Sequence, residues 1–220
     1  MKSLEIPHTG KKFPGFEPDG LKGDYPSATF ELSETPWKEY QYRPEVRGEI
    51  ATFLDGIFLS YSVRERFTRA KYIEDNFPVY EDSCVEFFIS PDGKNYFNFE
   101  FNCIGTLLLQ YGESRENRAF VNMKALKKIE RYSTLGKNQF EEREGDNSWR
   151  LSVFIPFALM EEVSGIKRFW VEAELGGNFY KCGDSLSLPH YVVWNRIETE
   201  KPDYHRPEFF GRLIFQYGSV

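Results

Sequence analysis

Alternating hydrophobic and polar residues between Val79 and Gly105 predict a β-hairpin. In the second half, the aromatic positions share one side of the predicted strand: Phe97, Phe99 and Phe101. The other side carries Tyr96, Asn98, Glu100 and Asn102. The first half alternates in the same way, with Val85, Phe87 and Ile89 against Cys84 and Glu86, and SPDGKN between the halves supplies turn formers. One face of this hairpin should therefore be core and the other polar.

The same period-2 pattern recurs along the chain and predicts an all-β protein. RGEIATFL and IFLSYSV flank Asp55-Gly56, which indicates a second hairpin. Further strands are predicted at 149–156, at 168–175, where Trp170 and Glu172 share a polar face, and in the final RLIFQY. PFALMEEV suits a short helix, whereas 113–147 is polar and 176–210 reads as a long excursion. We expect a single-domain antiparallel β-sandwich, immunoglobulin-like or jelly-roll-like, with nine to eleven strands and one or two short helices.

The domain organisation is predicted to be simple. Residues 1–27 are rich in Pro and Gly and read as an extended lead-in with little regular structure. Residues 28–220 form the β-sandwich domain, because 220 residues suffice for one full core and no internal repeat interrupts them.

Charge and hydropathy exclude two classes of partner. Lys and Arg number 28 against 34 Asp and Glu, and a net charge of -6 does not provide the basic surface that nucleic acid requires. No apolar run approaches the ~20 residues of a membrane span, so no membrane partner is expected. The N-terminus lacks the apolar region of a signal peptide, which predicts a cytoplasmic protein as the chain stands, or a secreted or periplasmic one if a leader was omitted. The oligomeric state stays open.

No metal site follows from the spacing of the potential ligands. The three cysteines are an odd number without a CxxC motif, and Cys84 and Cys103 should lie on opposite faces of one sheet and not bond to each other. Cys182, His190 and His205 share one excursion without a standard zinc spacing and are interpreted as structural. No cofactor is required. A structural Ca²⁺ is compatible with the acidic loop residues, which are Asp55, Asp82, Asp92, Asp184 and Asp203.

The polar faces form a candidate binding platform. Sugars present C–H patches that stack on aromatic rings and hydroxyls that need paired donors and acceptors. The chain offers Tyr80, Glu86, Tyr96, Asn98, Glu100, Trp170, Glu172, Glu174 and Trp194 for this purpose. Three alternatives remain open: an ordinary solvated sheet face, a glycoside hydrolase that uses a carboxylate pair such as Glu86 and Glu100, and a protein-interaction β-sandwich.

Several longer stretches, VYEDSCVEFFISP, YFNFEFNCIG, NFYKCGD, PHYVVWNRI and PDYHRPEFFGRLIF, together resemble the family 9 carbohydrate-binding modules and the bacterial family-9-like proteins. The resemblance runs in order from about Arg47 to Phe215. It implies a DOMON-like β-sandwich that binds sugars, often the ends of glucan or xylan chains, frequently with bound calcium and attached to xylanases.

The resemblance also implies roles for single residues. Tyr80 and Trp194 correspond to the two stacking walls, and Glu86 to the carboxylate that accepts hydroxyl hydrogen bonds. The supporting polar or aromatic candidates are Asn98, Glu100, Asn195, Trp170 and Glu172. Two departures stand out: Tyr80 replaces a tryptophan, and Asn98 and Glu100 occupy a strand where family modules place a basic residue. The predicted function is non-catalytic binding of a glucan- or xylan-type saccharide.

Overall fold

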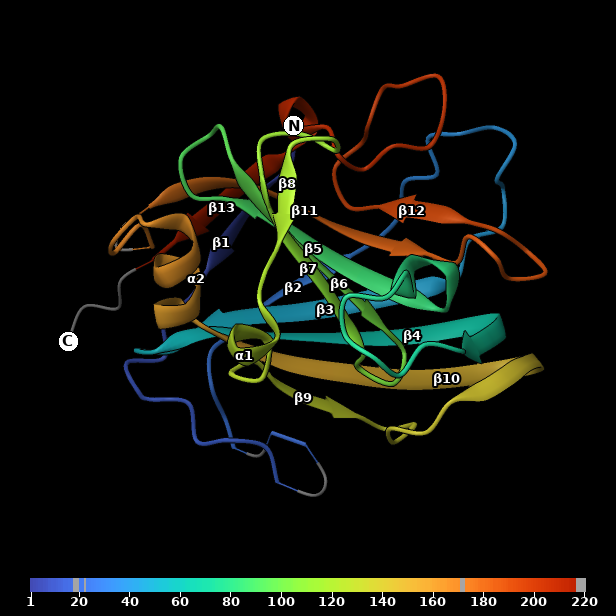
Figure 1. The fold of residues 1–220 in the computed structure, drawn as a ribbon, viewed down its shortest axis with the longest axis horizontal. Helices are drawn as coiled ribbons and strands as arrows, with labels where there is room; N and C mark the ends of the chain where they lie inside the picture. The colour runs from blue at the N-terminus through green and yellow to red at the C-terminus, as the bar shows by residue number, and fades with distance from the viewer. Residues whose placement is uncertain (18–19, 22, 171–172, 217–220) are drawn as a thin grey trace.

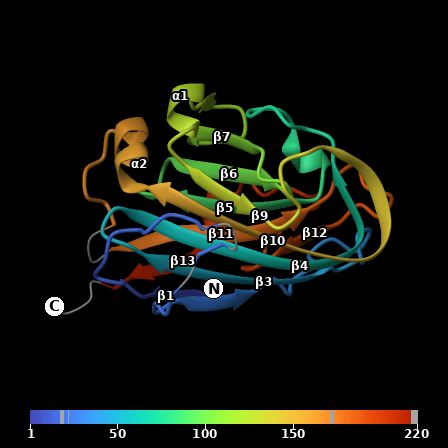
Figure 2. The same cartoon turned by 90° about the horizontal axis from the view of Figure 1, so that it is seen from below.

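The computed structural model describes residues 1–17, 20–21, 23–170 and 173–216. Two β-sheets face each other, as Figures 1 and 2 show. The larger sheet has the strand order β1-β13-β11-β5-β6-β7-β8, and β12 pairs with β11 outside this path. Apart from the parallel pair β1–β13, its strands pair antiparallel. Its strands are β1 (Ser3–Ile6), β5 (Cys84–Ser90), β6 (Tyr96–Asn102), β7 (Leu107–Gly112), β8 (Arg118–Phe120), β11 (Glu174–Cys182), β12 (Tyr191–Val193) and β13 (Gly211–Phe215).

The second sheet has five antiparallel strands in the order β2-β3-β4-β10-β9. They are β2 (Ala28–Glu31), β3 (Glu45–Thr52), β4 (Gly56–Ala70), β9 (Glu130–Ser133) and β10 (Phe140–Pro156). The hairpin predicted around Asp55-Gly56 is the β3–β4 pair, in which Thr52 lies opposite Ile57. The predicted antiparallel sandwich is therefore confirmed, with thirteen strands among the described residues instead of nine to eleven.

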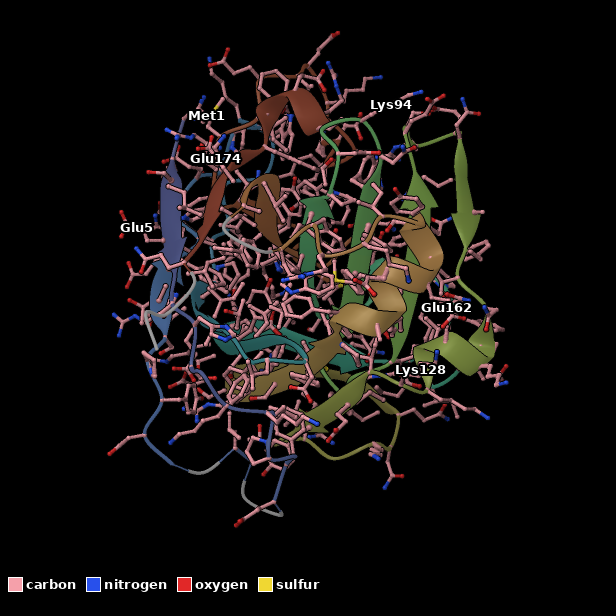
Figure 3. All side chains as sticks on the ribbon, turned by 90° about the vertical axis from the view of Figure 1, so that its left-hand side faces the viewer. Met1, Glu5, Lys94, Lys128, Glu162 and Glu174 are labelled. Carbon is pink, nitrogen blue, oxygen red and sulfur yellow. The ribbon has the colours of Figure 1, made fainter. Side chains whose placement is uncertain are left out.

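The helices are short and lie outside the two sheets. They are α1 (Met123–Leu126), α2 (Phe157–Ser164) and the 3-10 turns η1 (Val79–Glu81) and η2 (Pro207–Phe209). Figure 3 shows Lys128, just after α1, beside Glu162 on α2, and their Nζ and Oε2 atoms are 2.6 Å apart.

The main hydrophobic core fills the space between the sheets. Phe97, Phe99 and Phe101 of β6 are fully buried there, next to the inward residues of β5. Because β5 and β6 pair antiparallel with Phe87 opposite Phe99, the hairpin predicted from alternation is confirmed, including its two faces. Cys103 lies in this core whereas Cys84 lies on the other face, and all three cysteines are free thiols.

The outer face of the larger sheet is covered by a second layer of chain. Residues after β11 and the segment before β3 lie side by side over it, and Trp37 packs against Tyr204 with ring centroids 6.0 Å apart (Figure 1). The backbone bridge between Glu34 and Val193 joins the two segments. The face that alternation identified as polar is consequently buried, except where the covering layer leaves a cleft.

Two segments differ from the sequence prediction. Residues 176–182, expected to open a loop, belong to β11, which lies centrally between β13 and β5. Of the strand expected at 168–175, Phe169 and Trp170 form a turn, residues 171–172 lie outside the described residues, and β11 begins at Glu174.

The lead-in is more ordered than expected. Ser3–Ile6 form an edge strand, and Phe13 and Phe16 pack with Phe53, Phe58 and Phe154 on the outer face of the five-stranded sheet. A domain boundary at residue 28 stays a prediction.

Candidate functional site

A cleft of about 320 Å³ opens on the outer face of the larger sheet, between the sheet and its covering layer. Strands β5, β6, β7, β8 and β11 contribute the floor, and η1 and the segment after β11 contribute the sides. The lining residues are Tyr80, Glu86, Glu100, Leu108, Gln110, Arg115, Arg118, Phe120, Cys182, Asp184, Tyr191, Pro202, Asp203, Tyr204 and His205.

Two carboxyl groups lie on the floor, directly opposite each other on adjacent strands. Glu86 of β5 is the register partner of Glu100 of β6, and Leu108 of β7 continues the row. Residues two apart on a strand share a face, which is why the polar side of the hairpin faces the cleft. Glu86 and Glu100 are only 3% and 4% exposed, so this face is not an ordinary solvated surface.

Burial changes the proton affinity of the carboxyl groups in the cleft. Desolvation, and then the charge of Glu100, raises the pKa of Glu86 well above its ordinary value. Desolvation raises the pKa of Glu100 to about 7, although the Asn98 amide and the Arg118 guanidinium act in the opposite direction. Burial also raises the pKa of Asp184 to about 6. The cleft therefore holds polar groups that can both accept hydrogen bonds and, when protonated, donate them.

Arginines from the β7–β8 region add fixed donors. Arg115 pairs with Asp203 at 2.8 Å, and Nε and Nη2 of Arg118 donate to the Arg115 carbonyl. Nη1 of Arg118 is buried and has no hydrogen-bond partner among the residues that the structure describes. A buried donor without a partner is costly, so this nitrogen is well placed for an oxygen atom of a ligand.

Aromatic rings border the cleft on opposite parts of the sheet. Tyr80 on η1 is 38% exposed, and Phe120 at the end of β8 is 58% exposed. Tyr191 and Tyr204 of the covering layer also line the cleft. His205 contacts the Tyr96 hydroxyl through Nδ1 at 3.2 Å, and burial lowers the pKa of His205 to about 2, so the ring is neutral.

A family comparison matches this chain over most of its length. The model of carbohydrate-binding family 9 covers residues 25–215, which includes the whole cleft and every strand of both sheets except β1. The chain belongs to carbohydrate-binding family 9.

Solved structures agree with the family 9 assignment. A candidate carbohydrate-binding protein from Bacteroides uniformis is 38% identical, with a TM-score of 0.86 over 98% of this chain and 99% of that chain. A family 9 module from Caldicellulosiruptor kristjanssonii in complex with cellotriose is 8% identical, with a TM-score of 0.59 over 99% of this chain and 95% of that one. The same kind of module in complex with glucose is 10% identical, with a TM-score of 0.58 over 99% and 97%. At such low identity, the last two show the fold alone.

Among curated proteins, none matches this family 9 chain. Within the part of the chain that the structure describes, no helix is both long enough and apolar enough to cross a membrane.

The structure brings three of the predicted site residues of this family 9 domain together. Tyr80, Glu86 and Glu100 all line the cleft. Asn98 is fully buried beside them, on the same face of β6, and donates to Oε1 of Glu100 at 2.8 Å, so it orients that carboxyl group. Whether these residues contact a sugar stays a prediction.

Trp194 and Asn195 lie elsewhere, and the expected pairing of Tyr80 with Trp194 across a cleft is wrong. Trp194 is 5% exposed and packs edge-on against Phe179 in the core, with ring centroids 5.5 Å apart. The side chain of Asn195 forms hydrogen bonds with the backbone: it donates to the Phe209 carbonyl and accepts from the Lys2 amide. Trp194 directly follows β12, which pairs with β11 in the middle of the sheet, and this position places the Trp194 ring against Phe179 of β11.

Trp170 is not among the residues that line the cleft. Trp170 stacks on Phe157 of α2 at 4.1 Å, beside the main core. Glu172 lies outside the described residues.

The loop aspartates considered for calcium are mostly satisfied by protein donors. Asp82 is fully buried and accepts from Arg69, from two backbone amides and from Asn102. Asp92 accepts from Lys94 and Asn95 within its own turn, and Asp203 pairs with Arg115. With its oxygen atoms occupied in this way, Asp82 does not fit a calcium-ligand role.

Sequence reasoning missed Arg115, Arg118, Phe120, Asp184 and Tyr191 as lining residues. The first three fall in the polar stretch 113–147, which has no clear period, and the last two in a segment without strand alternation. Arg118, Phe120 and Tyr191 lie in the three-residue strands β8 and β12, which are too short to show an alternation, and Arg115 and Asp184 lie in loops.

Proposed function

We propose that this chain is a non-catalytic carbohydrate-binding domain that holds a glucan- or xylan-type oligosaccharide, or the end of such a chain, in the cleft over β5, β6 and β7. The cellotriose and glucose bound by two relatives of the same fold support this ligand class. The observation that carries the proposal is the combination of an exposed Tyr80 ring with buried Glu86 and Glu100 carboxyl groups and an unsatisfied Arg118 donor in one cleft.

Each lining group has a role that suits a sugar ring. Tyr80 stacks on the C–H face of a pyranose, and Phe120 takes the second aromatic position in place of Trp194. Glu86 is the principal acceptor of hydroxyl hydrogen bonds, Glu100 the second, and Arg118 donates through Nη1. Asn98 holds Glu100 in position.

The proposal requires no cofactor and no nucleic-acid or membrane partner. A structural Ca²⁺ and an association with a xylanase, both implied by the family resemblance, stay predictions, as do the compartment and the oligomeric state.

Calorimetric titration with gluco- and xylo-oligosaccharides tests the proposal. Tyr80→Ala should weaken binding by about 0.5–1.5 kcal/mol, roughly 2- to 10-fold, because a stacking face is lost. Tyr80→Trp should keep it, and Trp194→Phe, in the core, should leave the affinity unchanged. Among the described residues that line the cleft there is no tryptophan, so calorimetry is preferable to tryptophan fluorescence.

Chromatography of the same saccharides after long incubation tests the absence of catalysis. Intact saccharides are expected. Shorter products that disappear with Glu86→Gln would instead establish a glycoside hydrolase, and affinity for a polypeptide without any for glycans would favour a protein-interaction domain.

A further inference from the structure

Two cysteines and a glutamate meet at one end of the cleft floor. Cys84 is the first residue of β5 and Cys182 the last residue of β11, and the two are register partners in this antiparallel pair. Glu86 lies two residues along β5 and therefore on the same face of the sheet. All three belong to the neighbouring strands β11 and β5, whose pairing fixes their backbone positions.

Their donor atoms are close enough to share one ion. The two Sγ atoms and one Glu86 carboxylate oxygen lie within 4.8 Å of one another, and Sγ of Cys182 is 3.1 Å from Oε1 of Glu86. Zn–S bonds of ~2.3 Å and Zn–O bonds of ~2.0–2.2 Å in a tetrahedron put ligand atoms roughly 3.3–3.8 Å apart. Small side-chain rotations would bring the three groups to this spacing.

The surroundings differ from those of a cysteine that only packs. Cys103 provides the comparison: it lies in the core between the sheets, and its thiol contacts the Arg69 carbonyl at 3.4 Å. Cys182, in contrast, contacts Glu86 and also the Asp184 carboxyl group, and both acids line the cleft. A route for a hydrated ion therefore exists through the cleft to Cys182 and Glu86.

We propose that Cys84, Cys182 and Glu86 form a Zn²⁺ site at the floor of the cleft, with the fourth coordination position facing the cleft and open to water or to Asp184. Mixed thiolate and carboxylate donors in a tetrahedral arrangement suit Zn²⁺ better than Ca²⁺ or Mg²⁺, which prefer oxygen ligands. An open position is a feature of zinc sites that bind further ligands.

Proton balance gives the site a characteristic pH dependence. Each thiol that becomes a ligand transfers its proton to the solvent as the Zn–S bond forms, and Zn²⁺ binding should therefore release protons and tighten as the pH rises.

Zinc titration of the reduced full chain, without saccharide, tests the proposal. We expect one Zn²⁺ per chain by calorimetry, and a thiolate-to-metal charge-transfer band when Co²⁺ replaces Zn²⁺. Cys84→Ala and Cys182→Ala should each lose more than the roughly 10- to 100-fold in affinity that removal of an outer-shell partner costs. Cys103→Ala is the matched control, because it removes a buried thiol on the other face and should retain full affinity. Thermal melting of each variant establishes that it is folded.

Two results would overturn the proposal: no Zn²⁺ binding by the reduced protein at micromolar concentrations, or binding that folded Cys84→Ala retains. This test is separable from that of the proposed function. Cys84 does not line the cleft, so Cys84→Ala should abolish Zn²⁺ binding while the saccharide affinity of the metal-free protein is unchanged.

Discussion

At the scale of single residues, burial decides which polar groups can bind a ligand and what binding costs. Alternation correctly placed Glu86 and Glu100 on the non-core face of the hairpin. It could not show that a second layer covers this face, because the period of a strand reports which residues share a side and not what lies against that side. Trp194 illustrates the same limit, since a tryptophan in an irregular segment can lie in a core or on a cleft wall with identical sequence neighbours.

His205 gives a prediction of pH dependence at this scale. Its pKa falls from 6.5 in the unfolded chain to about 2 in the folded protein, so below pH 6.5 the unfolded state binds the additional proton. Lowering the pH from 7 to 5 should therefore cost about 2 kcal/mol of unfolding free energy through this residue. Urea denaturation of wild type and His205→Gln at both pH values measures the difference.

The comparison between the two proteins isolates His205 from the other titrating groups. The raised pKa values of Glu100 and Asp184 act with the opposite sign, because the folded state gains protons there as the pH falls. The contributions of Glu100 and Asp184 are present in both proteins and cancel when the pH dependence of the variant is subtracted from that of wild type. Equal pH dependence of wild type and variant would contradict a buried neutral His205.

At the scale of elements, strand β11 determines the architecture of the site. It joins β5 to β13, supplies Cys182 to the cleft and precedes the covering layer. The sequence suggested a loop here because Gly176-Gly177 is a typical turn signal. In the structure Gly177 instead permits close packing: a Cβ atom there would lie 2.4 Å from Leu213 and 2.8 Å from the Phe88 carbonyl.

Adjacent glycines in β11 give a matched pair of variants. Gly177→Ala should destabilise the protein by about 1–3 kcal/mol, because the methyl group would overpack the strand interface. Gly176→Ala should change stability by no more than about 0.5 kcal/mol, because the nearest atom to its Cβ, on Phe210, is 3.5 Å away. Denaturant midpoints check both, and equal effects of the two substitutions would contradict this packing.

At the scale of the whole molecule, a buried ion pair joins the two sheets. Lys181 of β11 and Glu65 of β4 have fully buried side chains, and Nζ and Oε2 are 2.8 Å apart. Trp149 donates to the same carboxylate at 2.7 Å, and His190 lies 2.8 Å from Nζ of Lys181. Burial lowers the pKa of His190 well below its ordinary value, so the neutral ring accepts from the ammonium group.

Replacement of only one member of this ion pair should lower the free energy of unfolding far more than replacement of both members. Lys181→Met leaves an uncompensated buried carboxylate and should cost about 3–5 kcal/mol. Glu65→Leu combined with Lys181→Met should cost less than the sum of the two single substitutions. Additive effects in the double-mutant cycle would show that the pair does not couple the sheets.

Much of the molecule could be anticipated from its sequence because the fold depends on local alternation and two Asp-Gly turns. The cleft depends on contacts between residues far apart in the chain, such as Tyr80 with the segment after β11, where Asp184 donates its backbone amide to the Tyr80 carbonyl. Such contacts leave no periodic pattern, which is why the floor of the site was predictable and most of its sides were not.

The most direct test of carbohydrate binding is calorimetric titration of wild type and Glu86→Gln with cello- and xylo-oligosaccharides in buffer that contains a metal chelator. We predict saturable binding by wild type that weakens by about 1–3 kcal/mol, roughly 5- to 150-fold, in Glu86→Gln, because the amide cannot reproduce the hydrogen bonds of the buried carboxyl group to a sugar hydroxyl. Glu31→Gln, on the exposed edge of the other sheet, should bind like wild type. Absence of binding by wild type, or equal affinities of wild type and Glu86→Gln, would contradict a saccharide site in this cleft.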